Sequence, residues 1–215
     1  MQTLSIVQPE TAPLRSLRRN RARWMISGAM LFSGAAALAP LSSAHAEGLP
    51  TGGSVAAGAA TISASGTTAK IHQSSARAVI NWDGFSVASG NSVAFRQPDA
   101  NSATLNRVTG GAASSIAGMI TANGSVYLVN PNGIAITSTG TVQTGGSFVA
   151  STLDMADADF MAGKARFAGK GASKSVRNAG TIKAGESAYV ALLGGAVSNS
   201  GSISVPLGRL ALGSG

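Results

Sequence analysis

The chain has 215 residues, a formal net charge of +8, 28 glycines and no cysteine, and only 11% of its residues are charged and 5% aromatic. The missing cysteines exclude disulfides, thiolate catalysis and Cys-based zinc sites. Small residues outnumber long aliphatic and aromatic ones, which favours closely stacked strands over a helical core. Five of the sixteen basic residues lie between Arg15 and Arg23, and the part from Glu47 onward has eleven basic and seven acidic residues, so the charge does not indicate a nucleic-acid partner.

The first 46 residues predict a cleaved secretory signal. A basic cluster precedes an apolar segment from Trp24 to Leu41, and small residues follow at Ala44 and Ala46. Signal peptidase needs small residues at these two positions, so we expect cleavage before Glu47 and no membrane insertion afterwards. A retained anchor is the alternative, which the short, Ala- and Gly-rich apolar segment disfavours. The basic cluster consists of Arg15, Arg18, Arg19, Arg21 and Arg23.

The mature part, residues 47–215, opens with a small and polar stretch. We expect Glu47–Gly66 to form a first capping strand, with Trp82, Phe85 and Phe95 packed in that cap or in the first coils. A solenoid needs its first coil covered, because an exposed strand edge pairs with other chains.

A short unit then recurs about every 20 residues, which is the length of one coil of a parallel β-helix. The unit consists of a polar residue, a glycine, a Ser or Thr, and an isoleucine or valine. It occurs at Asn178–Ile182 and Asn199–Ile203, and related copies begin at Asn123 and Gly140. We expect glycine to supply a positive φ at the corners, and the β-branched residues to point inward. The sequence therefore predicts an all-β parallel β-helix. The alternative is an antiparallel sandwich, for which two-residue Asn-Gly hairpins between longer alternating runs are expected instead.

The segment Asp154–Asn178 breaks this repeat, and we expect it to leave the helix as a hairpin or loop. Its acids, Asp154, Asp157 and Asp159, lack the central Gly and final Glu of an EF-hand loop, so we predict no metal. His72, the one histidine of the mature part, is expected on a strand surface. Because no nucleophile or metalloprotease motif is present, we predict no enzyme and no cofactor.

The motif Asn130-Pro131-Asn132-Gly133-Ile134 has the composition of a rigid corner. Proline presets φ for a turn, and the first asparagine can accept a backbone N–H two residues on. Glycine then takes a positive φ and returns the chain to a strand. Turn chemistry alone explains every residue of this motif.

Four motifs occur in order along the mature chain: Ile80-Asn81-Trp82 with Phe85, Asn101-Ser102-Ala103 with Leu105–Thr109, Asn123–Ile134, and Ala150–Asp154. Together they resemble the secretion domain of two-partner secretion exoproteins, which is the haemagglutination activity domain of filamentous haemagglutinin-like adhesins. The high-molecular-weight adhesin branch is the one the chain resembles most. Many members also carry an Asn-Pro-Asn-Leu motif ahead of Asn-Pro-Asn-Gly-Ile, and this chain lacks it.

The resemblance implies a right-handed, single-stranded parallel β-helix with an N-terminal cap and extra-helical strands or a hairpin. It also implies a secreted or cell-surface protein that travels via the periplasm. There, the periplasmic domains and barrel of a partner outer-membrane transporter recognise it, and outside the cell it nucleates the folding of a large adhesin. Because the chain stops inside a repeat, we expect it to continue beyond residue 215, with host-surface or carbohydrate contacts made by downstream regions.

Two groups of residues are the site candidates. The corner from Asn130 to Ile134 is the expected secretion motif, and Asn106, Arg107 and Val108 are candidates for transporter recognition or folding. A carbohydrate-active or ligand-binding β-helix is the alternative, which needs facing carboxylates on an exposed sheet. A coat segment without a dedicated transporter is the third possibility. The carboxylates available to an enzyme include Asp83, Asp99, Asp154, Asp157, Asp159 and Glu186.

Overall fold

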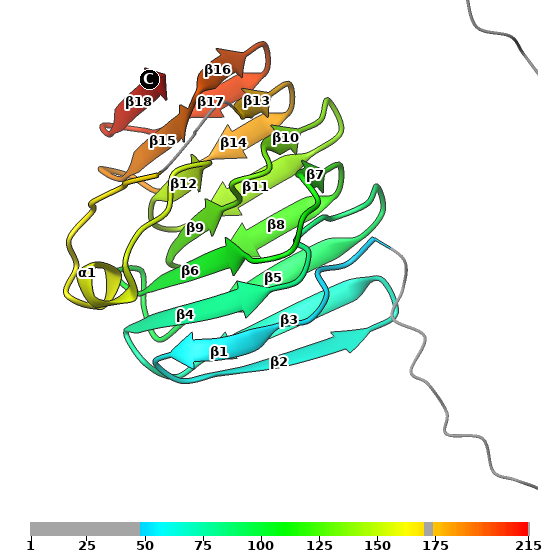
Figure 1. Cartoon of the computed structure of the whole chain (residues 1–215), viewed down its shortest axis with the longest axis vertical. Coiled ribbons are helices and arrows are strands. Elements are labelled where there is room, and N and C mark those ends of the chain that lie inside the picture. The colour runs from blue at the N-terminus through cyan, green and yellow to red at the C-terminus, as the bar shows by residue number, and fades with distance from the viewer. Residues whose placement is uncertain (1–47, 170–173, 215) are drawn as a thin grey trace, which may run out of the picture. The chain divides into compact units, whose positions relative to one another are not determined.

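The computed structural model describes residues 48–169 and 174–214, which form a parallel β-solenoid of about six turns (Figure 1). The strands stack into three sheets, one for each side of the coil. All strand pairs are parallel except two at the N-terminal end, β1 with β4 and β2 with β3. The predicted parallel β-helix is confirmed, and the antiparallel sandwich is excluded.

The three sheets are named here in the order of their first strands. The first sheet contains β1 (Ser54–Ala57), β4 (Arg77–Trp82), β6 (Ala103–Val108), β9 (Ser125–Val129), β12 (Phe148–Ser151), β15 (Tyr189–Gly194) and β18 (Arg209–Ser214). The second sheet contains β7 (Ser114–Ile116), β10 (Ile134–Ile136), β13 (Ser175–Asn178) and β16 (Ala196–Asn199). The third sheet contains β2 (Ala60–Ser65), β3 (Thr68–Gln73), β5 (Ser92–Arg96), β8 (Met119–Ala122), β11 (Thr141–Thr144), β14 (Thr181–Lys183) and β17 (Ser202–Ser204).

The core consists of apolar side chains that stack in register from rung to rung. Val126, Phe148 and Val190 are partners on consecutive rungs of the first sheet, and all three are fully buried. Ile120, Val142 and Ile182 form an equivalent stack in the third sheet. Burial of one such side chain contributes roughly 1.5–3 kcal/mol, so the stability of the solenoid accumulates along its axis.

The recurring glycines have a different role from the one expected. Gly140, Gly180 and Gly201 do not adopt a positive φ. A Cβ atom on them would lie 2.1 Å from the Ile116 carbonyl oxygen, 2.3 Å from that of Gly140 and 2.1 Å from that of Gly180, respectively. These distances are too short for any side chain, so glycine is required because successive corners stack backbone against backbone.

The N-terminal end of the solenoid is covered by two strands rather than by the single strand expected over Glu47–Gly66. β1 lies antiparallel on β4, and β2 lies antiparallel on β3. Beneath this cap, Trp82 and Phe85 meet edge to face with their ring centroids 5.4 Å apart, and both are buried, as is Phe95. The prediction that these three aromatic residues pack in the cap or the first coils is confirmed.

The chain leaves the solenoid after β12, as predicted, but the excursion is shorter and has a different form. An antiparallel bridge between Asp154 and Ala168 closes its neck, and a one-turn helix, α1 (Asp157–Met161), lies within it (Figure 1). The solenoid resumes at Ser175 instead of after Asn178, because Val176 and Asn178 fill inward positions of β13. Within residues 48–169 and 174–214, no helix is long and apolar enough to cross a membrane.

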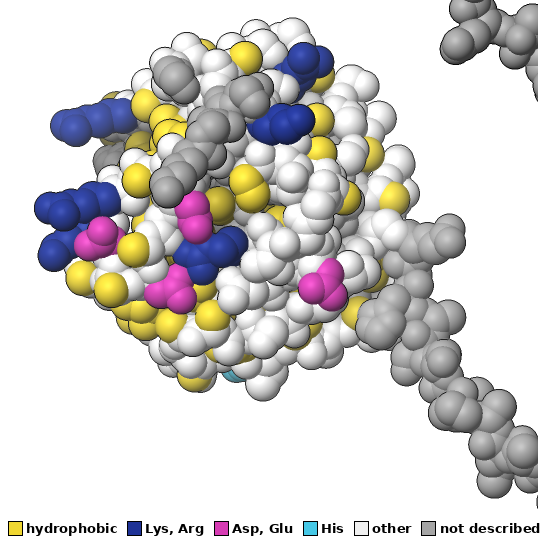
Figure 2. Space-filling model, in the orientation of Figure 1, with side chains coloured by type: hydrophobic (Ala, Val, Ile, Leu, Met, Phe, Trp, Pro, Cys, Tyr) yellow, Lys and Arg dark blue, Asp and Glu magenta, His cyan; other side chains and the backbone are white. Residues whose placement is uncertain are grey.

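The excursion covers the outer face of the first sheet. Met155 and Phe160 are buried against a second apolar cluster, separate from the solenoid core, that includes Leu105, Tyr127 and Val149. The middle of this sheet is therefore buried on both faces. Charged side chains of both signs gather on the surface over this region (Figure 2).

Candidate functional site

The Asn130–Ile134 corner connects β9 to β10 and has the hydrogen bonds of a tight turn. The Gly133 N–H donates to the Asn130 carbonyl oxygen over 3.1 Å, which closes the turn. The Asn132 N–H donates to Asn130 Oδ1 over 2.9 Å, which is the expected Asx-turn. Gly133 has φ +114°, a conformation that glycine adopts without strain. The turn chemistry predicted from the sequence is therefore what the structure contains.

Two asparagine side chains fasten this corner to the preceding coil. Asn130 is fully buried, and its Nδ2 donates to the Ala112 carbonyl oxygen at 3.0 Å and to Ser114 Oγ at 2.9 Å. Asn132 Nδ2 donates to the Gly110 carbonyl oxygen at 2.8 Å. These hydrogen bonds hold the loop between β6 and β7, which has few apolar residues of its own, against the corner.

The exposed part of the corner is small. Pro131 lies at the surface, whereas Gly133 and Ile134 are buried. Because a partner protein contacts exposed groups, the folded corner offers mainly the proline ring and part of Asn132. The buried amide of Asn130 contacts the preceding coil instead.

Asn106 and Val108 are also interior residues. The Trp82 indole N–H donates to Asn106 Oδ1 at 3.0 Å, and Asn106 Nδ2 donates to the Tyr127 carbonyl oxygen at 3.3 Å. Val108 packs in the solenoid core. Neither side chain is exposed on the surface of the folded domain.

Arg107 points outward between these two residues and holds the excursion. Its guanidinium contacts Asp154 Oδ1 at 2.8 Å and Asp157 Oδ1 at 2.7 Å, and donates to the Met155 carbonyl oxygen. Desolvation lowers the pKa of Arg107, but the hydrogen bonds and charges of the two aspartates outweigh it, so the pKa is raised. The sequence analysis treated Arg107 as a candidate for transporter recognition or folding, and the acidic segment as a separate loop. The fold brings the two into contact.

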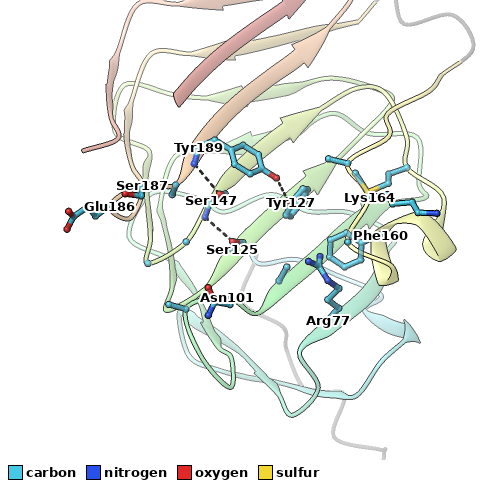
Figure 3. A pocket seen from close by; sticks show the side chains of 18 residues that line it. Arg77, Asn101, Ser125, Tyr127, Ser147, Phe160, Lys164, Glu186, Ser187 and Tyr189 are labelled. Carbon is cyan, nitrogen blue, oxygen red and sulfur yellow. Dashed lines mark hydrogen bonds between the residues drawn. The ribbon is translucent and has the colours of Figure 1, made fainter. Parts of the chain in front are cut away.

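A groove of about 490 Å³ lies between the outer face of the first sheet and the excursion (Figure 3). Arg77, Ser125, Tyr127 and Tyr189 line it from the sheet, and Lys164 lines it from the excursion. The hydroxyls of Tyr127 and Tyr189 are hydrogen-bonded to each other. Burial, followed by the proximity of Tyr189, raises the pKa of Tyr127 above its ordinary range, so this hydroxyl stays protonated. The sequence analysis did not find this groove, because it forms only when the excursion folds back over the sheet.

The groove lacks a pair of facing carboxylates among the residues that the structure describes. Among the described residues that line the groove, Glu186 is the only acid. Asp154 and Asp157 are paired with Arg107, and Asp99 Oδ1 accepts N–H groups within its own turn. The described residues also contain no group of three or more His, Cys, Asp or Glu side chains that could hold a metal ion.

Two further expectations have different outcomes. His72 is exposed on β3, as predicted. Ala44, Ala46 and Glu47, the residues of the expected signal-cleavage site, lie outside the described residues.

Comparison with known proteins identifies the family. Residues 46–215 match the model of the TPS secretion domain, where TPS denotes two-partner secretion. The crystal structure of the HMW1 secretion domain from Haemophilus influenzae is 37% identical, with a TM-score of 0.72, and the match covers 77% of this chain and 45% of that one.

Two curated relatives are the heme/hemopexin-binding proteins of Haemophilus influenzae. The protein from strain ATCC 51907 / DSM 11121 / KW20 / Rd is 46% identical over 112 residues, or 52% of this chain and 12% of the relative. The second is 44% identical over 85 residues, or 40% of this chain and 9% of the relative. This chain thus matches only a small part of each relative's length. Since the family model covers the whole described solenoid, the chain belongs to the family of TPS secretion domains and is the secretion domain of a two-partner secretion exoprotein.

Proposed function

We propose that this chain carries a large adhesin-like exoprotein through a partner outer-membrane transporter and starts the folding of that exoprotein outside the cell. Residues 1–46 direct export across the inner membrane and are removed before Glu47. Residues 47–215 are then recognised in the periplasm by the periplasmic domains of the transporter, and they pass through its barrel to the outside. The mature product is secreted or retained at the cell surface.

The cap at the N-terminal end of the solenoid supports the folding role. There, β1 and β2 cover the first coil and bury Trp82. A first coil on its own buries too little surface to be stable, whereas a coil that is added to a covered one gains strand partners immediately.

The buried hydrogen bonds of the corner support its proposed role in secretion. We expect Asn130→Ala or Asn132→Ala to reduce export, because each change removes side-chain donors that hold the previous coil. The transporter binds the unfolded or partly folded strands by pairing its own strand edges with them. The corner acts later, when the chain folds after passage.

Co-expression tests this proposal. The chain is expressed in a Gram-negative host with and without the transporter encoded beside it, and the medium and cell surface are assayed for the product. We expect export only with the transporter, and an exported product that starts at Glu47. Export without the transporter would favour the coat-segment alternative, and a product that starts at Met1 would contradict the signal assignment.

The names of the relatives concern heme and hemopexin binding, but the matched segment is 12% of one relative and 9% of the other. We therefore assign transport to this segment, and contacts with host surfaces to regions downstream of it. The enzyme alternative lacks a pair of facing carboxylates in the groove, because Glu186 is the only acid among the described residues that line it.

A further inference from the structure

The groove on the first sheet has a floor made by one register column of the solenoid. Arg77, Ala103 and Ser125 are partners on consecutive rungs, and the same column continues through Ser147 to Tyr189. Because rungs lie about 4.8 Å apart, the floor extends for about 19 Å along the solenoid axis. The groove is therefore elongated and crosses the strands at right angles.

Serine hydroxyls lie on two adjacent rungs of this floor. The Ser147 N–H donates to Ser125 Oγ over 2.9 Å, and the Tyr189 N–H donates to Ser147 Oγ over 3.1 Å (Figure 3). In each case the serine oxygen accepts a backbone N–H, so its own O–H hydrogen is free to donate. The floor thus presents two neighbouring hydroxyl donors, Ser125 and Ser147, beside the mutually bonded hydroxyls of Tyr127 and Tyr189.

Positive charge borders the groove on two sides. Arg77 lies over the Phe160 ring, 5.4 Å from its centroid, and Lys164 lines the groove from the excursion. Within residues 48–169 and 174–214 only Arg107 forms ion pairs, so neither Arg77 nor Lys164 has a carboxylate partner. Glu186, the one acid among the described lining residues, lies on the opposite side of the groove from Arg77 and Lys164 (Figure 3). A bound anion would therefore meet two cations that the protein leaves unneutralised.

From this arrangement we propose that the groove binds an anionic oligosaccharide, whose sugar units carry carboxylate or sulfate groups. Linked hexopyranose rings repeat at a distance close to the rung spacing, so two successive rings can meet the Ser125 and Ser147 hydroxyls on adjacent rungs. The anionic substituents pair with Arg77 and Lys164, and the volume of about 490 Å³ is in the usual range for small-ligand sites. This site is separate from the secretion role.

Other polymers fit the groove less well. An extended peptide that joins a sheet needs free backbone groups at a strand edge, whereas the floor strands β6, β9 and β12 are paired on both sides. A single-stranded nucleic acid needs several exposed aromatic faces for stacking, whereas Tyr127 and Phe160 are buried and only Tyr189 is partly exposed among the described aromatic residues of the groove.

Calorimetric titration of the purified chain tests the proposal with four probes. Two are anionic tetrasaccharides, one of galacturonate and one of sulfated heparin units, and they distinguish carboxylate from sulfate. Neutral cellotetraose and tetraglutamate test the sugar and the charge separately. We expect binding of at least one anionic tetrasaccharide, and binding of cellotetraose and tetraglutamate at least about tenfold weaker.

Three variants locate the binding. Arg77→Gln and Lys164→Gln should each weaken tetrasaccharide binding at least about fivefold, because each removes one charge-assisted contact. Arg96→Gln is the matched control, because Arg96 is an exposed cation at the end of β5 in the third sheet, and it should bind like the parent. Circular dichroism checks that all three variants are folded. The proposal is overturned if no tetrasaccharide binds, if tetraglutamate binds equally well, or if Arg96→Gln weakens binding as much as the groove variants do.

Discussion

The Asn130–Ile134 corner and the excursion after β12 are both attached to the solenoid by polar contacts, but the two attachments differ in their exposure. The corner is held by neutral amides, of which Asn130 is completely buried. The excursion is held by Arg107, whose side chain is 15% exposed, and by Asp154, whose side chain is 57% exposed. Water and salt therefore reach the second attachment and not the first.

This difference predicts different consequences of disruption. When a buried amide loses its partner, the remaining donor or acceptor stays buried and unpaired, which destabilises the whole coil. When a half-exposed ion pair is lost, water solvates the remaining charges, and only the segment it held is released. We therefore expect the corner to affect global unfolding and Arg107 to affect local opening.

The largest effect is expected for Asn130→Ala. The substitution leaves the Ala112 carbonyl oxygen, Ser114 Oγ and the Asn132 N–H without their partner. We expect the free energy of unfolding to fall by roughly 2–4 kcal/mol, as measured by urea denaturation. An unchanged midpoint would show that the corner is not a structural element.

The stacked glycine corners come next. In Gly180→Ala the new Cβ lies 2.3 Å from the Gly140 carbonyl oxygen, so the two coils must separate locally. We expect a loss of roughly 1–3 kcal/mol in the same urea experiment. The matched control is Gly111→Ala, because a Cβ at Gly111 has no atom within 4 Å and its φ is not positive. Equal losses for both variants would show that the tight stacking is not the cause.

Arg107→Ala tests the second attachment. We expect a smaller loss of global stability, about 1 kcal/mol, together with faster trypsin cleavage after Lys164 and Arg166 in the excursion. Raising the salt concentration should speed cleavage of the parent chain and have little effect on the variant. If the variant instead unfolds globally before it is cleaved, Arg107 stabilises the whole domain, as the corner does, and not only the excursion.

The smallest effect concerns alkaline pH. Because burial raises the pKa of Tyr127 in the folded chain, the unfolded chain loses this proton first. The folded state then binds more protons than the unfolded state, so stability is retained below about pH 10 and falls as the pH rises further. Tyr127→Phe should reduce this alkaline loss of stability. Urea titrations at pH values from about 9 to about 11 measure it, because this range spans the ordinary tyrosine pKa of about 10. An identical pH profile for the variant would assign the loss to other groups.

The sequence predicted the solenoid because its determinants are local and repeated. The unit that contains Asn178–Ile182 and Asn199–Ile203 places β14 and β17 correctly, and Asn130-Pro131-Asn132-Gly133 specifies its own turn. The aromatic residues of the cap were also recognisable, because an open first coil requires apolar cover.

The groove and the Arg107 contacts were not predictable in the same way. They depend on where the excursion folds back, and that position is set by Phe160 packing against Tyr127, with ring centroids 5.3 Å apart. Such a contact joins residues from distant parts of the chain and has no repeat or spacing that reveals it. The purpose of the recurring glycines was likewise hidden, because the close approach of Gly180 to Gly140 appears only once the coils are stacked.

The most direct test of the architectural role of the corner is export of the Pro131→Ala variant in cells that contain the partner transporter. Pro131 is the most exposed residue of the corner, so a transporter that binds the surface of the folded corner would contact it. If the corner acts through its buried amides, Pro131→Ala is exported at the level of the parent chain while Asn130→Ala is not. If Pro131→Ala is retained in the periplasm although its free energy of unfolding is unchanged, the transporter reads the surface of the corner and the architectural account is wrong.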